Sequence, residues 1–401
     1  MDELLRDRMH EALGVEPPPA GLRSRVINSV PMHGRVAPAP RARTLQWAGQ
    51  WAAGLVATVL ALALIAALLY SRGILGPLKP TQVGPGPHPG SQVVLESPEG
   101  VAIGPDGTVY VSDYLGNRVF RLEPGGKLVS IAGGGTGFDG PATKSNLFSP
   151  AGLAVDRDGN LYVADNLGGS IRRIDRQGMI TTFAAPVQTG AFVIGLGGPI
   201  GLALDSAGVL YMSNFQGEVR RFDTTAGPTG RELPLLDTSS LPPPVLFPGY
   251  MAFDSAGDLF ISDQAPTQPN SQHGVGPGGG CRIVRISPDK RLSVIAGTGT
   301  CGYSGDGGAA VAAQLNDPQG IAFDSSGNLY FADSQNHRIR RIDKNGIITT
   351  VAGPGIAGQL MIPIGIAMAN GDRLYFSDVS NAYVRMLRLS DGVITTVAGG
   401  Q

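Results

Sequence analysis

Short runs of alternating hydrophobic and polar residues recur along the chain from about residue 97 onward. In residues 327–353, GNLYFADSQNHRIRRIDKNGIITTVAG, three such runs are separated by Gly, Asn, Asp and other polar residues. A period of two residues is typical of a β-strand with one buried face, and the separating residues favour tight turns. This pattern, preceded by one further apolar run, occurs six times. It therefore indicates a repeated unit of architecture.

The six copies share enough residues for their strands to be placed. Every second strand has an aromatic residue at one register, as in NLYFAD at 328–333. Every first strand starts with Pro and contains Ala; these strands begin near residues 98, 150, 199, 248, 318 and 363. A single four-stranded antiparallel sheet cannot cover both of its own faces, so the six sheets must stack. Radial stacking predicts an all-β, six-bladed β-propeller.

Glycine in the first strands fits the narrow axis of such a ring. Five copies have it, at Gly100, Gly152, Gly201, Gly320 and Gly365. Tyr250 replaces this Gly in the fourth copy, which predicts a bulky ring near the axis or its mouth. Ring closure stays open between two alternatives: residues 91–97, SQVVLES, add an outer strand to the last blade, or the sixth copy is complete by itself.

Composition agrees with a large folded region containing many turns. The chain has 401 residues, 42% of them hydrophobic and 16% charged, so it can bury a sizeable core. Its 59 Gly and 31 Pro exceed a fifth of the chain without a collagen-like period. A formal net charge of -1 gives no global field that would attract nucleic acid or anionic substrates.

Residues 51–70, WAAGLVATVLALALIAALLY, contain no charged side chain. A helix of this length spans about 30 Å, the thickness of a bilayer core. Trp47, Trp51 and Tyr70 stand at its ends, where amphipathic rings favour the interface. A cleaved signal peptide is the alternative, but the apolar run is long and no Ala-x-Ala site follows it. We therefore predict one transmembrane helix within residues 47–72.

Flanking basic residues predict the orientation of this helix. Seven arginines precede it, whereas Arg72 and Lys79 follow it closely. The positive-inside rule places residues 1–46 in the cytoplasm, as a topogenic stretch or as a docking helix for a cytoplasmic partner. Residues 73–92 read as a Pro/Gly-rich linker, and residues 93–401 as an exported propeller. Removing nine basic and five acidic residues before the propeller leaves 22 basic and 27 acidic ones, a mildly acidic balance.

One copy, PQGIAFDSSGNLYFADSQNHRIRRIDKNGIITTVAG, resembles the NHL repeat family nearly residue for residue. The likeness extends over the six copies, about three quarters of the chain, and together with the anchor it resembles membrane-anchored bacterial members. It implies a six-bladed propeller that binds proteins, or in some members nucleic acid or small ligands, on one face. The repeat itself implies no reaction.

Acidic or amide residues close the second strand of all six copies. One interpretation is a ligand-binding face that holds cations or a basic partner. The other is a structural device in which each carboxylate accepts backbone N–H bonds or pairs with a third-strand arginine. The strand-end residues are Asp113, Asp165, Asn214, Asp263, Asp333 and Asp378. The arginines expected to pair and pack between blades are Arg121, Arg173, Arg221, Arg285 and Arg341, a series that Met386 interrupts.

Connection lengths predict which face of the ring binds. The first-to-second turns are tight; Asp156, Asp205, Asp254 and Asp324 mark hairpins there. Long insertions join second to third strands or one blade to the next, and these connections share one face. They span residues 134–148, 186–198, 264–280 and 298–317. We expect this face to bind, although tolerated surface insertions are the alternative.

The insertion at 298–317 contains two further features. Cys281 and Cys301, the two cysteines of the chain, fall in the fourth copy, where antiparallel pairing brings them close. Export then predicts a disulfide between them. GYSGDGG at 302–308 weakly resembles a calcium loop but lacks the regular acidic spacing, so a Gly-rich turn explains it equally well.

No catalytic, cofactor-binding or metal-binding residues are predicted. His273 and His337 lack histidine companions in register, and Glu99 reads as a solvated rim residue, with a metal-site role as the alternative. Nucleic acid is excluded as a partner by the acidic balance and the export. We expect a membrane-anchored scaffold or sensor that binds a protein, peptide or envelope ligand. A metal-dependent propeller enzyme, similar to lactonases or lyases, is the alternative.

Overall fold

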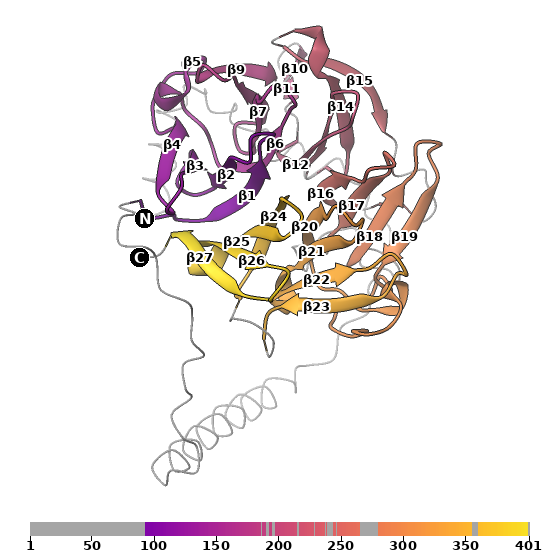
Figure 1. Ribbon diagram of the computed structural model, residues 1–401. Helices are drawn as coiled ribbons and strands as arrows, with labels where there is room; N and C mark the ends of the chain where they lie inside the picture. Colours follow the sequence, from indigo (N-terminus) through magenta and orange to yellow (C-terminus); the bar gives the residue numbers. More distant parts are fainter. Residues whose placement is uncertain are drawn as a thin grey trace, which may run out of the picture. The chain divides into compact units, whose positions relative to one another are not determined.

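Six antiparallel sheets follow one another around a common axis in the computed structural model (Figure 1). Five of them have four strands, and that of blade two has a fifth, β5 (Gly140–Pro141), at its outer edge. The four strands that every blade shares lie in chain order, with the first innermost. The structure describes residues 93–399 except 186, 190–191, 195–196, 215, 228, 237, 239–243, 246, 265–279 and 355–359. The predicted six-bladed propeller is confirmed.

The blades start where the repeated sequence placed them. The inner strands are β1 (Pro98–Ile103), β6 (Pro150–Val155), β12 (Pro199–Leu204), β16 (Pro248–Phe253), β20 (Pro318–Phe323) and β24 (Pro363–Ala369). The second strands are β2 (Val109–Asp113), β7 (Leu161–Asp165), β13 (Val209–Asn214), β17 (Leu259–Asp263), β21 (Leu329–Asp333) and β25 (Arg373–Asp378).

The outer half of each blade is equally regular. The third strands are β3 (Arg118–Leu122), β8 (Ser170–Ile174), β14 (Val219–Asp223), β18 (Arg282–Ile286), β22 (Arg338–Ile342) and β26 (Tyr383–Arg388). The fourth strands are β4 (Leu128–Gly133), β9 (Met179–Ala184), β15 (Arg231–Leu236), β19 (Leu292–Ala296), β23 (Ile348–Ala352) and β27 (Ile394–Gly399).

Short elements lie in the connections. These are the strands β5 (Gly140–Pro141), β10 (Val187–Thr189) and β11 (Phe192–Ile194), and the 3₁₀ turns η1 (Ala142–Lys144), η2 (Thr224–Ala226), η3 (Ala310–Ala312), η4 (Ser334–Asn336) and η5 (Val379–Asn381). Within the residues that the structure describes, no helix is both long and apolar enough to cross a membrane. The span predicted at residues 51–70 lies outside those residues.

Glycine and serine join the inner strands of neighbouring blades. A Cβ added to Gly152 would lie 2.2 Å from the carbonyl oxygen of Ile200, so this close approach requires glycine. The Ser112 hydroxyl donates to the carbonyl of Ala151 in the next blade at 2.6 Å and accepts from the Gly100 N–H at 2.8 Å. The glycines predicted to suit the axis therefore lie there.

The ring closes between β24 and β1. The Ser377 hydroxyl donates to the carbonyl of Glu99 at 2.7 Å, repeating the serine contact across the junction. Blade six takes all four strands from its own copy, and residues 93–97 form no strand. Leu95 is buried with Val384 and Ala398. Of the two alternatives for closure, the complete sixth copy is correct and the added outer strand is wrong.

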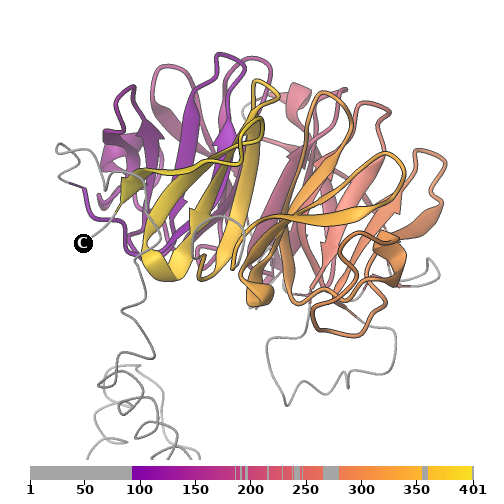
Figure 2. The same cartoon turned by 60° about the horizontal axis from the view of Figure 1, so that its bottom comes forward.

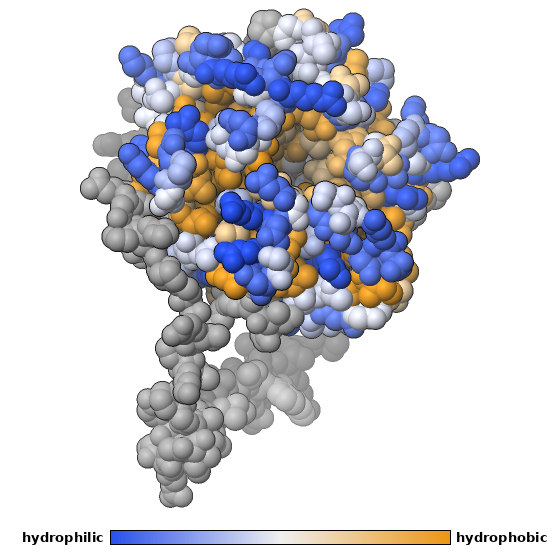
Figure 3. Space-filling view, in the orientation of Figure 1, coloured by the Kyte–Doolittle hydropathy of each residue, from blue (hydrophilic) through white to orange (hydrophobic). Residues whose placement is uncertain are grey.

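The propeller has two distinct faces (Figure 2). We call the side where the second strands end the loop face, because the second-to-third and blade-to-blade connections lie there. We call the opposite side, with the first-to-second and third-to-fourth hairpins, the turn face. At its first-to-second connections the predicted hairpin turns are present: Asp156 and Asp324 accept the N–H groups of Asn160 and Asn328. Hydrophilic residues cover most of the turn face (Figure 3).

Two long insertions depart from their predicted place. Residues 134–148 leave the loop face, pair as β5 with the outer strand β9, and reach Gly178 on the turn face, where the Ala142 N–H donates to its carbonyl at 2.8 Å. Residues 298–317 repeat this course along β23, with the Ala310 N–H on the Gly346 carbonyl at 2.8 Å. The expectation that these loops crowd the loop face is wrong. They satisfy the free backbone groups of outer edge strands.

Candidate functional site: the loop face and the axial channel

The six strand-end residues lie at the loop face, and all are at most 2% exposed. Their side chains accept backbone N–H groups of the segment that leads into the inner strand, or of their own turn. Asp165 accepts from Phe148 at 2.6 Å, Asp333 from Asn316 at 2.7 Å, and Asn214 from Glu218 at 3.0 Å. This geometry favours the structural interpretation. A ligand-binding role for these six groups stays a prediction.

In four blades a buried third-strand arginine lies beside the strand-end carboxylate. Arg340 is fully buried and lies 3.2 Å from Asp333 and 2.8 Å from Asp306, which comes from the insertion along β23. Arg172 makes the matching contact with Asp139 of the other insertion at 3.1 Å. Arg282 and Arg385 pair with Asp263 and Asp378. These arginines hold the loop-face carboxylates in place.

The arginines named from the sequence are different ones. Arg173 donates to Asn160 at 2.8 Å and Arg285 lies 3.5 Å from Asp258, both within one blade. Their cross-strand neighbours are the second-strand aromatic residues, such as Tyr162 opposite Arg173. The expected blade-to-blade pairing is therefore wrong for them. Arg172 and Arg340 come one position earlier, as the first residue of an RR pair, and alternation along the strand puts them on its other face.

Burial acts on the carboxylates of this device. Burial raises the pKa of Asp333 to about 6, against the lowering effect of Asn336, the Asn316 N–H and Arg340. Burial likewise raises the pKa of Asp165 to about 6, although the Phe148 N–H and Arg172 lower it. Both carboxyl groups are bound by loop-face backbone N–H groups, so they serve the structure of that face.

GYSGDGG at 302–308 forms part of the insertion along β23. Asp306 accepts from Arg340 at 2.8 Å, from the Tyr303 hydroxyl at 2.9 Å and from Thr350 at 2.5 Å. Its carboxylate is thus occupied by protein donors, as in a structural turn. The predicted disulfide between Cys281 and Cys301 is present, with the Cα atoms 5.3 Å apart, and it fastens the start of this insertion to β18.

Exposed apolar side chains gather on the loop face of blades one and two. Leu115 is 58% exposed, Phe148 43% and Leu167 72%. Backbone and side-chain contacts place their loops side by side: the Leu167 N–H donates to the Phe148 carbonyl at 3.0 Å, and the Ser149 N–H to Asn117 at 2.8 Å. We call these three residues the apolar loop patch. The sequence offered a signal in the matching Leu of DYLGN and DNLGG.

The propeller axis contains the other departure from symmetry. Tyr250 is 8% exposed, and its hydroxyl donates to Glu99 Oε1 at 3.3 Å. Burial raises the pKa of Glu99 to about 7, although the Tyr250 hydrogen bond lowers it. Tyr250 was placed correctly from the sequence. The expectation of a solvated rim position for Glu99 is wrong, because the side chain is half-buried and faces the channel.

An apolar cavity of about 170 Å³ lies on the axis. All six inner strands line it, with Leu153, Leu202, Ile321, Ile366 and the Tyr250 ring among the lining groups. On the turn face, Figure 3 shows a hollow near the centre that hydrophobic residues border. Within the part of the chain that the structure describes, no three His, Cys, Asp or Glu side chains gather as metal ligands.

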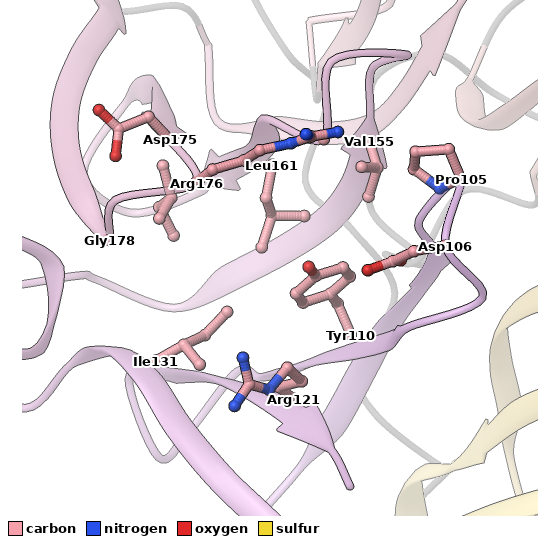
Figure 4. Close-up of a pocket in the computed structure, with 12 residues that line it drawn as sticks. Pro105, Asp106, Tyr110, Arg121, Ile131, Val155, Leu161, Asp175, Arg176 and Gly178 are labelled. Carbon is pink, nitrogen blue, oxygen red and sulfur yellow. The ribbon is translucent and has the colours of Figure 1, made fainter.

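A recess of about 430 Å³ separates blades one and two on the turn face. Figure 4 shows Tyr110 beside Asp106. Arg176 of blade two lies on one side of the Tyr110 phenol ring and Arg121 on the other. Hydrogen bonds to Thr108, and the nearby Arg176, keep the pKa of Asp106 below its usual value. A similar recess lies between blades six and one. Because recesses occur at two successive blade junctions, we attribute the one between blades one and two to the gap between neighbouring blades.

His337 belongs neither to the apolar loop patch nor to the axial channel. His337 ends η4 in a left-handed conformation with φ of 59°, and its Nδ1 contacts the carbonyl of Met361. His273 lies outside the described residues. The histidine expected to lack a partner in register is thus part of a loop-face turn.

Two segments of the chain match the family described as the Teneurin NHL domain, over residues 132–191 and 187–357. Together they cover more than half of the sequence. The chain belongs to the teneurin NHL domain family. The NHL resemblance inferred from the repeats is confirmed.

Two teneurins and one plant protein match limited parts of this teneurin NHL domain protein. Teneurin-1 of Mus musculus is 30% identical over 248 residues, 52% of this chain and 8% of the relative. Teneurin-1 of Homo sapiens is 32% identical over 162 residues, 39% of this chain and 5% of the relative. Protein SUPPRESSOR OF QUENCHING 1 of Arabidopsis thaliana is 40% identical over 89 residues, 21% of this chain and 8% of the relative. The chain spans less than a tenth of each of these relatives.

Solved structures share the fold of this teneurin NHL domain protein. A Bacteroides thetaiotaomicron protein of unknown function has a TM-score of 0.54 at 18% identity, covering 74% of this chain and 70% of that one. An auxiliary nutrient binding protein of the same organism has a TM-score of 0.53 at 16% identity, with coverages of 76% and 70%. At these identities the likeness extends to the fold alone.

Proposed function

We propose that this chain is a membrane-anchored, extracytoplasmic NHL propeller that binds a protein, peptide or envelope ligand through its loop face. The apolar loop patch carries the proposal. Three large apolar side chains, between 43% and 72% exposed, stand on adjoining loops of two blades. Exposed apolar groups that adjoin one another are typical of interaction sites, whereas scattered ones are not.

The framework beneath the patch supports the same function. Asp165 fixes the backbone of Phe148 at 2.6 Å, and Leu167 follows two residues after Asp165. A rigid base reduces the entropy lost when a partner orders these loops. The buried strand-end carboxylates therefore hold in place the loops that would contact a partner.

Anchoring and export rest on the amino-terminal sequence. The uncharged residues 51–70 and the seven preceding arginines favour a single-pass protein with a cytoplasmic amino terminus. The disulfide agrees with an oxidising compartment. We propose accordingly that the propeller is displayed outside the membrane, on the linker of residues 73–92.

Affinity capture from envelope extract with the full chain tests the binding face. The loop variant combines Leu115→Ser, Phe148→Ser and Leu167→Ser. The control combines Met179→Ser and Val393→Ser, two turn-face residues that are 41% and 44% exposed. We expect a partner that the parent and the control retain and that the loop variant binds at least tenfold more weakly, since a buried apolar contact contributes about 1–2 kcal/mol or more. Equal capture by both variants rejects the loop face.

A metal-dependent enzyme with its site in the axial channel is the second candidate. Glu99 in the channel is the observation that favours it. Metal analysis of the purified full chain separates the two functions: a stoichiometric divalent ion that Glu99→Gln removes would favour the enzyme.

A further inference from the structure

Two residues break the internal repeat on the inner strands. The positions equivalent to Glu99 hold Ala151, Ile200, Gly249, Gln319 and Ile364, and those equivalent to Tyr250 hold glycine in every other copy. Four blades form with neither residue, so neither is needed to build a blade. Blades one and four lie opposite each other in the ring (Figure 1), and the two side chains meet across it at 3.3 Å. Both departures from symmetry therefore point to one place.

Glu99 differs from the other buried acids in its partners. Asp263, Asp333 and Asp378 each pair with an arginine. Among the described residues, Glu99 forms no ion pair, and its side-chain hydrogen bond is the one from Tyr250. Tyr114 lies within its field, since the carboxylate contributes to the raised pKa of this tyrosine. The channel thus contains a carboxyl group that has no cationic partner among the described residues and that is hydrogen-bonded to the Tyr250 phenol.

The groups around the Glu99 carboxylate favour an ammonium group over a calcium ion. Calcium takes about six to eight oxygen ligands, and the described residues offer no cluster of acidic side chains here. An ammonium group has three donors and is attracted by carboxylates and aromatic rings. The adjoining cavity of about 170 Å³ is lined mainly by aliphatic side chains. It has room for about six water-sized volumes, at roughly 30 Å³ each, or for a short alkyl chain.

We propose that the axial channel binds a primary ammonium group on a short alkyl chain, with Glu99 and Tyr250 holding the nitrogen and the apolar cavity holding the chain. A free alkylamine and a lysine side chain of a partner share this chemistry. The site is separate from the apolar loop patch, so its failure would leave the proposed loop-face binding untouched.

Isothermal titration calorimetry of the full chain at pH 8 tests this site. The probes are n-butylammonium chloride, the uncharged butan-1-ol, Nα-acetyl-lysine N-methylamide and calcium chloride. We expect one butylammonium per chain and at least tenfold weaker binding of butan-1-ol. Binding of the lysine derivative as well assigns the site to a partner side chain, and its absence assigns it to free amines.

Variants decide whether Glu99 and Tyr250 hold the nitrogen. Glu99→Gln should weaken butylammonium binding at least tenfold and Tyr250→Phe several-fold. Glu96→Gln changes an exposed carboxylate three residues away and should leave it unchanged. Unaltered binding by Glu99→Gln, equal binding of butan-1-ol, or stoichiometric calcium in place of the amine would overturn the proposal. A circular dichroism melt of each variant confirms that it is folded.

Discussion

Glu99 is an acid that the fold holds in an apolar channel, so its ionisation opposes folding. Its pKa rises from 4.5 to about 7 on folding. Between these two pH values the folded state therefore binds more protons than the unfolded state, and the free energy of unfolding falls as the pH rises. Below pH 4.5 the group adds its full stabilisation; above pH 7 it adds none.

Glu99→Gln removes this dependence. Relative to the parent, the variant should gain about 1–3 kcal/mol of unfolding free energy between pH 4.5 and pH 8, the lower part of the range applying because water reaches the half-buried side chain. Urea unfolding at the two pH values measures the change. A difference between variant and parent that does not vary with pH would contradict the burial of this carboxyl.

Arg340 illustrates the other electrostatic situation, a buried cation with its partners in place. It bridges Asp333 and Asp306 and donates to the carbonyls of Gln314 and Ser304 at 3.0 and 2.8 Å. Arg340→Met should lower the unfolding free energy by about 3–5 kcal/mol, because two carboxylates lose their cation. The matched change Arg388→Met removes an exposed pair with Asp391 and should cost less than about 1 kcal/mol. Urea midpoints that shift equally would refute this role.

At the scale of elements, strands and turns followed directly from the sequence. The period of two, the aromatic residue of each second strand and the Asp-initiated hairpins act locally, so each copy predicts its own sheet. The course of the insertions did not follow, because pairing with an outer strand such as β9 or β23 is a contact between distant residues. The two insertions do share one feature in the sequence, an acidic residue, Asp139 or Asp306. Each of these residues forms an ion pair with a third-strand arginine, Arg172 or Arg340 respectively.

The disulfide stabilises one of these insertions. The bond closes a loop with a sequence separation of 20. Cys281→Ser with Cys301→Ser should lower the unfolding free energy by about 3 kcal/mol by the chain-entropy estimate. It should also speed amide exchange in residues 298–317 before it affects other blades. Reductant should move the parent to the midpoint of the variant and leave the variant unchanged; a parent that ignores reductant would show that the bond is absent.

At the scale of the whole molecule, the number of blades could be counted from the sequence, whereas their closure and the channel contents could not. Closure depends on β1 meeting β24 across almost the whole propeller, a contact that no local pattern encodes. Glu99 and Tyr250 were each visible as exceptions to the repeat. Their meeting required the ring, because blades one and four become neighbours across the axis only when it closes.

Export is a prediction for the whole chain, and thiol labelling measures it. The two natural cysteines form the disulfide, so a new cysteine can be labelled selectively. Ser326→Cys, in an exposed hairpin of blade five, should react with a membrane-impermeant maleimide in intact cells. Ser24→Cys, in the predicted cytoplasmic segment, should react only after permeabilisation. The reverse pattern would place the propeller inside.

Photo-crosslinking in intact cells tests the central claim, that the loop face of this propeller binds a partner. A photoreactive phenylalanine analogue replaces Leu167 on the loop face or Val393 on the turn face, both exposed apolar positions. The account predicts a discrete adduct from position 167, lost when Leu115→Ser and Phe148→Ser are added, and none from position 393. Adducts of equal yield from both positions, or from position 393 alone, would contradict it.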